Sequence, residues 1–479
     1  MLKKIILSTT LLVLLVHYAF ADDISLPAIG NDQSNRFSQA EEKLLGEAFM
    51  RQVRLGLPVS SDPEVADYIS HLGFRLIANS EFQSHHFHFF VVNDTNINAF
   101  AGPNGYIGIN AGLILKTENE SELASVVAHE IAHVTQRHLE RTFESNDKLS
   151  LSTAAAIIAA IVLGSSANIN LTEAAIFAAL AANTQSQLSH SRIHEMEADN
   201  IGIKILKNSD FDPHAMPSFF EKLQQASGNS DDLHLEFLRT HPVTVNRIAE
   251  SRNRASKITF QLAPDNFIYH LSKAKLRVMT EKNVSSLVKK IEAELKAGSY
   301  QNKFAQIYAY ALALFETEKF NQASKQIDKL IKMDRERIHY LILKANIKIG
   351  QNKLDEGFKI FRESLTLNPG NPSISLHYAD ALLTNKQPVT AKKTLLNMDN
   401  YRSTPLYYQL MAKAEDDAGL KGASHQMLAE YFLMFAQIGL AINHLKQALT
   451  EKDTTEIDER KIKKRIREIK EIARLEEQL

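Results

Sequence analysis

Two histidines, His129 and His133, stand four residues apart in the stretch SVVAHEIAHVTQRH at 125–138. In a helix, positions i and i+4 share a face, so both imidazoles can bind one metal ion while Glu130 reaches a water beside it. Neutral imidazole suits Zn²⁺, and a carboxylate can take a proton from a water that attacks a polarised carbonyl. The pattern predicts a hydrolytic zinc site. A helix with two polar residues on a wet face is the alternative.

A catalytic zinc site needs a third protein ligand. The stretch SRIHEMEADNIGIKIL, at 191–206, has helical spacing of apolar residues and presents Glu195 and Asp199 four apart. Glu195 would complete a set of two histidines and one glutamate with an open fourth position. Asp199 could accept the far ring N–H of a metal-binding histidine and fix its tautomer. One ion per chain is expected. The apolar neighbours of His129 predict that its helix is largely buried, where a polar ring needs partners.

Two residues of the stretch RTHPVTVNR are further catalytic candidates. His241 could donate to the oxyanion or occupy the open metal position in a resting state; a capping histidine before Pro242 is the alternative. Arg247 could stabilise developing charge or pair with a carboxylate.

Other histidines are left out of the predicted site. His138 follows His133 by five residues and falls off the ligand face of a continuous helix. Three more alternate along an expected strand without carboxylates at a suitable spacing, which predicts surface positions: His85, His86 and His88.

The elements that must position these residues can be read from periodicity. Helical spacing at 37–55 and 65–80 is followed by β-branched and aromatic residues at 87–114, where Gly102-Pro103-Asn104-Gly105 predicts a hairpin. Thr117 or Asn119 would cap the helix with the histidines. Proteases of this chemistry bind substrate as a strand added to a sheet edge, and the residues expected at that edge are Asn98, Ala99, Phe100 and Ala101.

Small residues recur at a nearly fixed distance in the second half of the chain. One series is spaced 34, 34 and 33 and the other 34, 34 and 32: Ala311, Ala345, Ala379 and Ala412, then Ala323, Gly357, Ala391 and Ala423. This period resembles the tetratricopeptide repeat, in which small residues let paired helices pack closely, and a generic helical array is the alternative. Isoleucines on one face of 456–479 predict a capping helix.

Composition and targeting signals limit the class of protein. The chain has 479 residues, no cysteine, and 55 basic against 56 acidic residues, so no overall field favours nucleic acid. Lys3 and Lys4 precede an apolar run, and Ala19-Phe20-Ala21 predicts signal cleavage after Ala21; an uncleaved anchor is the alternative. Apolar runs at 151–164 and 174–182 are too short to span a bilayer. They predict a helical hairpin that could form a lid or touch a membrane surface.

HEIAH followed by EMEAD resembles the zinc endopeptidase family that includes the CaaX prenyl-protein protease and the bacterial heat-shock membrane protease. The resemblance, which INAFAGPNGYIGI and THPVTVNRI share, implies that the third ligand is Glu195 rather than Glu197. The signal sequence and repeats match the exported, repeat-bearing branch. That match implies a periplasmic protease whose substrates are unfolded or misassembled outer-membrane β-barrel proteins, with the repeats docking on the β-barrel assembly machinery or on the substrate.

The predicted architecture is an α+β zincin-like metalloprotease domain at 22–258 and an all-α tetratricopeptide-repeat solenoid at 263–450, with a capping helix at 451–479. The predicted function is zinc-dependent endopeptidase in protein quality control. A repeat-based chaperone or adaptor for envelope proteins, with little protease activity, is the rival interpretation; Glu130 speaks against it, because a structural zinc needs no base.

Overall fold

The computed structural model describes residues 38–80, 86–143, 184–229, 236–261, 264, 266–399 and 402–478. Residues 40–479 belong to one compact unit. The predicted signal sequence and the apolar hairpin at 151–182 lie outside the described residues. Among the helices that are described, none combines the length and the apolar character needed to cross a membrane.

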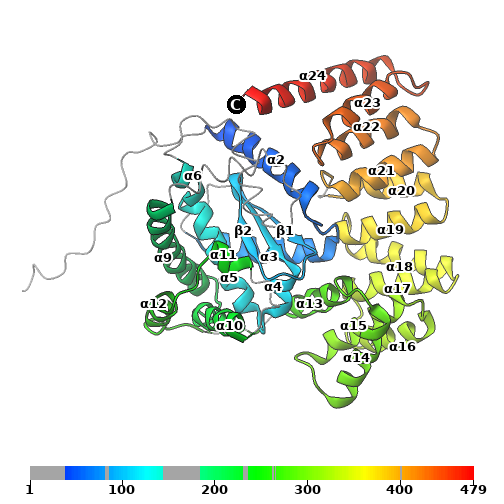
Figure 1. The fold of residues 1–479 in the computed structure, drawn as a ribbon. Coiled ribbons are helices and arrows are strands. Elements are labelled where there is room, and N and C mark those ends of the chain that lie inside the picture. The colour runs from blue at the N-terminus through cyan, green and yellow to red at the C-terminus, as the bar shows by residue number, and fades with distance from the viewer. Residues whose placement is uncertain are drawn as a thin grey trace, which may run out of the picture. The chain divides into compact units, whose positions relative to one another are not determined.

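Two helices and a small sheet open the described chain (Figure 1). α2 (Gln39–Gly56) and α3 (Pro63–Ala78) correspond to the helices predicted at 37–55 and 65–80 and have nearly the same limits. α3 begins two residues before the predicted start, because Asp62 caps it: Asp62 Oδ1 accepts from the backbone N–H groups of Glu64 and Val65, at 3.1 and 3.0 Å, and Pro63 occupies the first turn. Its apolar stripe is buried in the hydrophobic core that it shares with the sheet.

The sheet has three strands, β1 (His88–Val92), β2 (Ala99–Ala101) and β3 (Tyr106–Asn110), in the order β1-β3-β2. β2 and β3 form the predicted hairpin through η2 (Pro103–Gly105). Gly105 has a φ of 71°, and a Cβ there would lie 1.8 Å from the carbonyl oxygen of His86. The parallel pairing of β1 with β3 was not predicted. Because β3 lies in the middle of the sheet, β2 is an edge strand.

The described elements after β3, up to residue 255, are helical. They are α4 (Ala111–Lys116), α5 (Glu120–Thr135), α6 (His138–Phe143), α9 (Thr184–Asn208), α10 (Ala215–Asn229), α11 (Glu236–Thr240) and α12 (Val245–Ala255). Of the two predicted caps of α5, Asn119 is the one used, because its Oδ1 accepts from Glu122 N at 3.0 Å. Thr117 instead bonds to Ile114 O and Tyr269. α5 is buried almost throughout, with α9 packed along it.

Paired helices follow from residue 267 and confirm the tetratricopeptide interpretation. They are α13 (Phe267–Met279), α14 (Val284–Ala297), α15 (Lys303–Glu316), α16 (Phe320–Ile331), α17 (Ile338–Gly350), α18 (Leu354–Leu367), α19 (Pro372–Thr384), α20 (Pro388–Leu396), α21 (Pro405–Asp417), α22 (Lys421–Leu433) and α23 (Ile438–Ala448). The alanines of the first periodic series are buried. Left-handed residues at Glu318, Asn352 and Lys386 turn the chain between the helices of a pair, again 34 residues apart. The domain limits remain predictions.

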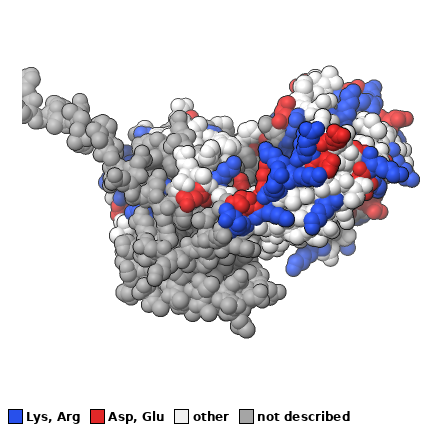
Figure 2. Space-filling view, turned by 90° about the horizontal axis from the view of Figure 1, so that it is seen from above, with Lys and Arg blue, Asp and Glu red and all other residues white. Residues whose placement is uncertain are grey.

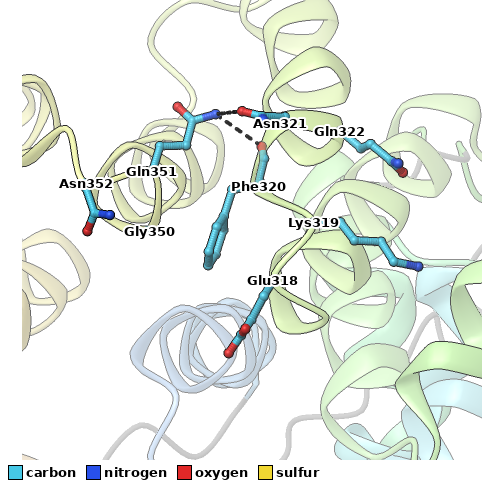
Figure 3. A pocket seen from close by; sticks show the side chains of 8 residues that line it. All are labelled: Glu318, Lys319, Phe320, Asn321, Gln322, Gly350, Gln351 and Asn352. Atoms are coloured by element: carbon cyan, nitrogen blue, oxygen red, sulfur yellow. Dashed lines mark hydrogen bonds between the residues drawn. The ribbon is translucent and has the colours of Figure 1, made fainter.

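Turns of consecutive repeats touch at a surface pocket, shown in Figure 3. Gln351 Nε2 donates to Asn321 Oδ1 at 2.9 Å and lies 3.4 Å from Phe320 O. A Cβ at Gly350 would lie 2.5 Å from the ring of Phe320. The lack of a side chain at Gly350 thus lets this ring fill the space between two repeats.

α24 (Glu456–Gln478) ends the described chain and packs on α23 through Ile462 and Ile469, which are almost fully buried. Figure 2, seen from the side of α24, shows Lys and Arg interspersed with Asp and Glu. Ion pairs such as Lys463–Glu459 and Arg465–Glu430 account for this mixture. α24 thus gives the last repeat a polar outer surface, as a capping helix does.

Candidate metal centre

The two histidines of α5 and Glu195 of α9 converge. His129 Nε2 and His133 Nε2 are 3.0 Å apart. Glu195 Oε2 lies 3.4 Å from His129 Nε2, and Glu195 Oε1 lies 3.3 Å from His133 Nε2. Ligand atoms at roughly 2.0–2.1 Å from a tetrahedral zinc ion lie about 3.3 Å from one another. The three side chains therefore have the spacing of a metal-binding set.

His241 is the fourth member of this group. Its Nδ1 lies 2.9 Å from Glu195 Oε1 and 3.4 Å from His129 Nε2, which are again distances between ligands of one ion. The four side chains form a candidate metal site, with one ligand atom from each. His241 follows α11, and its ring stacks on Phe237 with centroids 4.9 Å apart. The sequence left its role open between an oxyanion donor and a resting ligand; the distances are those of a ligand.

A glycine sets the distance between the two helices that carry the ligands. Gly202, on α9, faces α5, and a Cβ at this position would lie 3.3 Å from His129 N and 2.8 Å from the methyl carbon of Met216. The missing side chain lets the backbone of α9 come close to α5 at the first ligand.

Asp199 and Arg247 surround the ligands. Asp199 Oδ1 lies 3.0 Å from His129 Nδ1, the ring nitrogen that faces away from the other ligands. Arg247 Nη1 lies 2.7 Å from Glu195 Oε2. Both side chains are only about 5% exposed. Asp199 thus lies beside the far ring nitrogen of His129, and Arg247 contacts two carboxylates, those of Glu195 and Asp199.

Charge in the site is distributed unevenly. Burial alone would lower the pKa of His129, but contacts with Asp199 and Glu195 raise it to about 10. Burial lowers the pKa of His133 to about 3. Burial would raise the pKa of Glu195, but the three neighbouring histidines bring it well below its ordinary range. Metal binding here competes with protonation of His129, because only an unprotonated imidazole is a ligand.

Glu130 is fully buried beside this group, with Oε1 3.5 Å from His241 Nε2. Burial raises the pKa of its carboxyl group. The backbone of Ala101, in β2, partly offsets this shift, and no side chain among the described residues donates a hydrogen bond to either oxygen. A carboxylate with a raised pKa and free lone pairs is suited to accept a proton from water and to release it again.

The predicted substrate strand lies next to the site. β2 packs against α5, and Asn98, just before it, accepts from Asn110 N at 3.0 Å. Ile97 O accepts a hydrogen bond from Phe237 N, at 3.1 Å. The start of α11, which leads to His241, is thereby tied to the segment before the edge strand.

The sequence reasoning missed one contact of the ligands. It excluded His138 because five positions of a continuous helix turn a side chain about 140° from the first. The chain is not continuous there: α5 ends at Thr135, and Arg137 adopts a left-handed φ of 55°. His138 Nδ1 returns to within 2.9 Å of His133 Nδ1. The side chain of His86 is exposed, and the ring of His88 stacks on Tyr106, so neither histidine belongs to the site. His85 lies outside the described residues.

Comparison with known proteins follows the same division of the chain. The model for peptidase family M48 matches residues 63–255, and a tetratricopeptide-repeat model matches 348–414. The β-barrel assembly-enhancing protease of Escherichia coli (strain K12) is 32% identical over 456 residues, covering 95% of this chain and 93% of that protein. The chain belongs to the β-barrel assembly-enhancing protease family. The family member of Yersinia pestis is also 32% identical, over 88% of this chain and 87% of its own.

More distant relatives match a smaller share of the chain. Mitochondrial metalloendopeptidase OMA1 of Schizosaccharomyces pombe is 32% identical over 181 residues, 38% of this chain and 50% of that protein. As a member of the β-barrel assembly-enhancing protease family, the chain is a metalloendopeptidase with a repeat region. The enzyme and fold class predicted from the sequence are confirmed.

Proposed function

We propose that this chain is a zinc-dependent endopeptidase of the periplasm that degrades misassembled outer-membrane β-barrel proteins and assists their assembly. The observation that carries the proposal is the convergence of four candidate ligands from His129, His133, Glu195 and His241, with Glu130 beside them. Two imidazoles and a carboxylate are the donors of a catalytic zinc site. The names of the relatives support β-barrel proteins as substrates.

The described residues divide the reaction among them. Zinc, when bound by His129, His133 and Glu195, supplies Lewis-acid activation of the water and the scissile carbonyl. The edge of β2 binds the substrate as an extended strand through backbone hydrogen bonds, which tolerates many sequences. Glu130 takes a proton from the attacking water and delivers it to the leaving nitrogen.

With zinc bound, His241 would hold it as a fourth ligand at rest. Its Nδ1 is as close to Glu195 and His129 as a fourth ligand would be, so a water cannot take that position until His241 moves away. His241→Ala should therefore keep one zinc ion per chain and raise the cleavage rate of an unfolded substrate. A lower rate with full zinc content would assign His241 to the oxyanion instead.

Glu130→Gln tests the central proposal. The variant should bind one zinc ion per chain, measured by metal analysis, and should fail to cleave an unfolded outer-membrane protein. Unchanged proteolysis would refute the role of Glu130. His129→Asn and Glu195→Gln should lose zinc, and full metal content in both would refute the ligand set.

The cellular part of the proposal needs its own tests. The exported protein should start at Asp22 when its N-terminus is sequenced from the periplasmic fraction, because the signal sequence is removed after Ala21. The repeats would dock on the β-barrel assembly machinery or on the substrate. Crosslinking from the repeat surface in intact cells should trap one of these two partners, and trapping of neither would remove this part of the proposal.

A further inference from the structure

A second chain of contacts leads from His133 away from the predicted ligands. His133 Nδ1 is 2.9 Å from His138 Nδ1, and His138 Nε2 is 3.1 Å from Glu197 Oε2. Arg141 Nη1, from the same short helix as His138, donates to Glu197 Oε2 at 3.0 Å. His138 is 4% exposed, whereas the side chain of Glu197 is 34% exposed.

Donor and acceptor roles follow from the carboxylate. A charged carboxylate can only accept, so His138 Nε2 donates to Glu197, and the neutral ring then has an unprotonated Nδ1. That nitrogen accepts from His133 Nδ1–H. His133 consequently carries its proton on Nδ1 and presents the lone pair of Nε2, the atom that faces His129 and Glu195.

We propose that His138 and Glu197 are positioning residues that fix the tautomer and orientation of His133 for metal binding. The inference rests on the proposed metal site. It gives His133 an outer partner, as Asp199 gives one to His129. Outer partners of metal-binding histidines fix the ring and raise its basicity, and their loss costs roughly 10–100-fold in metal affinity or activity.

Packing holds the relay in place. The ring of His138 stacks on His194, with centroids 4.3 Å apart and planes 8° from parallel. His194 precedes the ligand Glu195 on α9, so the stack places His138 against the helix that supplies the third ligand. Arg137, with its left-handed φ, directly precedes α6, and His138, the first residue of α6, makes this stacking contact.

The test measures zinc affinity in the full chain carrying Glu130→Gln, so that self-cleavage cannot interfere. His138→Phe keeps a stacking ring but removes both hydrogen bonds. Competition with a chromophoric chelator should give a zinc Kd about 10–100-fold higher than that of the parent. His138→Asn, whose side-chain oxygen can accept from His133, should recover part of this loss. His71→Phe is the matched control, because His71 is 77% exposed on α3.

Glu197→Ala is the second variant, at a position where the side chain is 34% exposed. It should weaken zinc binding less than His138→Phe, because the hydrogen bond to His133 remains. If His138→Phe does not fold, Glu197→Ala decides alone: a higher Kd supports the relay, and an unchanged Kd overturns it.

The failure of the relay can be told apart from failure of the metal site. A parent protein that binds no zinc would refute the proposed function itself. A parent that binds one zinc ion per chain, with the same Kd in His138→Phe and Glu197→Ala, would refute only the relay. Loss of affinity in His138→Phe that His138→Asn does not reduce at all would also overturn it, because packing would then be the cause.

Discussion

Arg247 donates two parallel hydrogen bonds to Asp199, from Nε to Oδ2 and from Nη2 to Oδ1, each 2.8 Å long. A third contact reaches Glu195, and Pro242 O accepts from Nη1 at 2.9 Å. A planar guanidinium can make these contacts together, whereas a lysine ammonium cannot. The side chain thus joins the third ligand to the partner of the first.

Replacing this fork should affect both stability and metal binding. Arg247→Lys should lower the free energy of unfolding by about 2–4 kcal/mol, because buried carboxylates lose partners, and should raise the zinc Kd. Chemical denaturation and chelator competition measure the two effects. Arg254→Lys, on the same helix but 36% exposed, should change stability by less than about 1 kcal/mol. Wild-type zinc affinity in Arg247→Lys would contradict the positioning role.

Substituting Gly202 should separate the two helices of the site. Gly202→Val adds atoms against the backbone at His129, so α9 must move away from α5. The zinc Kd should rise at least tenfold and the protein should melt at a lower temperature. Gly439→Val is the matched control, since a Cβ at this helical position meets nothing within 4 Å. Equal effects of both substitutions would show that the close approach at Gly202 does not matter.

Metal removal should lower the melting temperature. Zinc bound by the folded state alone stabilises it by about 4 kcal/mol when free zinc exceeds the Kd about a thousandfold. Thermal unfolding with and without EDTA measures the shift. Glu195→Gln, which loses a ligand, should melt at one temperature in both buffers. Identical melting of the parent with and without EDTA would argue against an ion in this site.

A buried ion network predicts a pH dependence. Lys275, on α13, binds Glu64 and lies 2.6 Å from Asp62 at the start of α3. His377 and His339 also face Glu64, at 3.5 and 3.8 Å. Burial opposes ionisation, but Lys275 and both histidines hold the pKa of Glu64 far below its ordinary 4.5. The charged carboxylate therefore stabilises the fold above about pH 4.5, and this contribution is lost as the pH falls toward the folded-state value.

Glu64→Gln should accordingly be less stable than the parent by about 3–5 kcal/mol at pH 7, because Lys275 loses a buried partner. The difference should narrow below pH 4.5. Lys275 does not alter this sign, because its pKa is raised and its contribution is complete on the acid side. Denaturation at several pH values tests the trend, with Glu356→Gln at an exposed pair as the control. A constant difference from pH 7 to pH 3 would contradict it.

The features that depend on neighbouring residues could be predicted from the sequence, whereas those that depend on contacts between distant segments could not. The spacing of His129 and His133, the turn at Gly102–Gly105 and the 34-residue period each depend on neighbours in sequence, and the structure has those elements. The parallel partner of β1 depends on a contact between separate segments. His138 was excluded because the turn at Arg137 contains neither glycine nor proline to announce it. Arg247 could not be assigned, since only the packing of α12 on α9 brings it to Asp199.

The glycine at position 202 also bears on which metal the site accepts. Calcium prefers oxygen ligands at about 2.3–2.6 Å, farther than the roughly 2.0–2.1 Å of zinc and nitrogen. With α9 close to α5 at Gly202, the two helices offer imidazole nitrogens and a single carboxylate, whereas calcium takes about six to eight oxygen ligands. Selectivity here thus comes from donor type, and a residue with no side chain allows the close approach that brings these donors together.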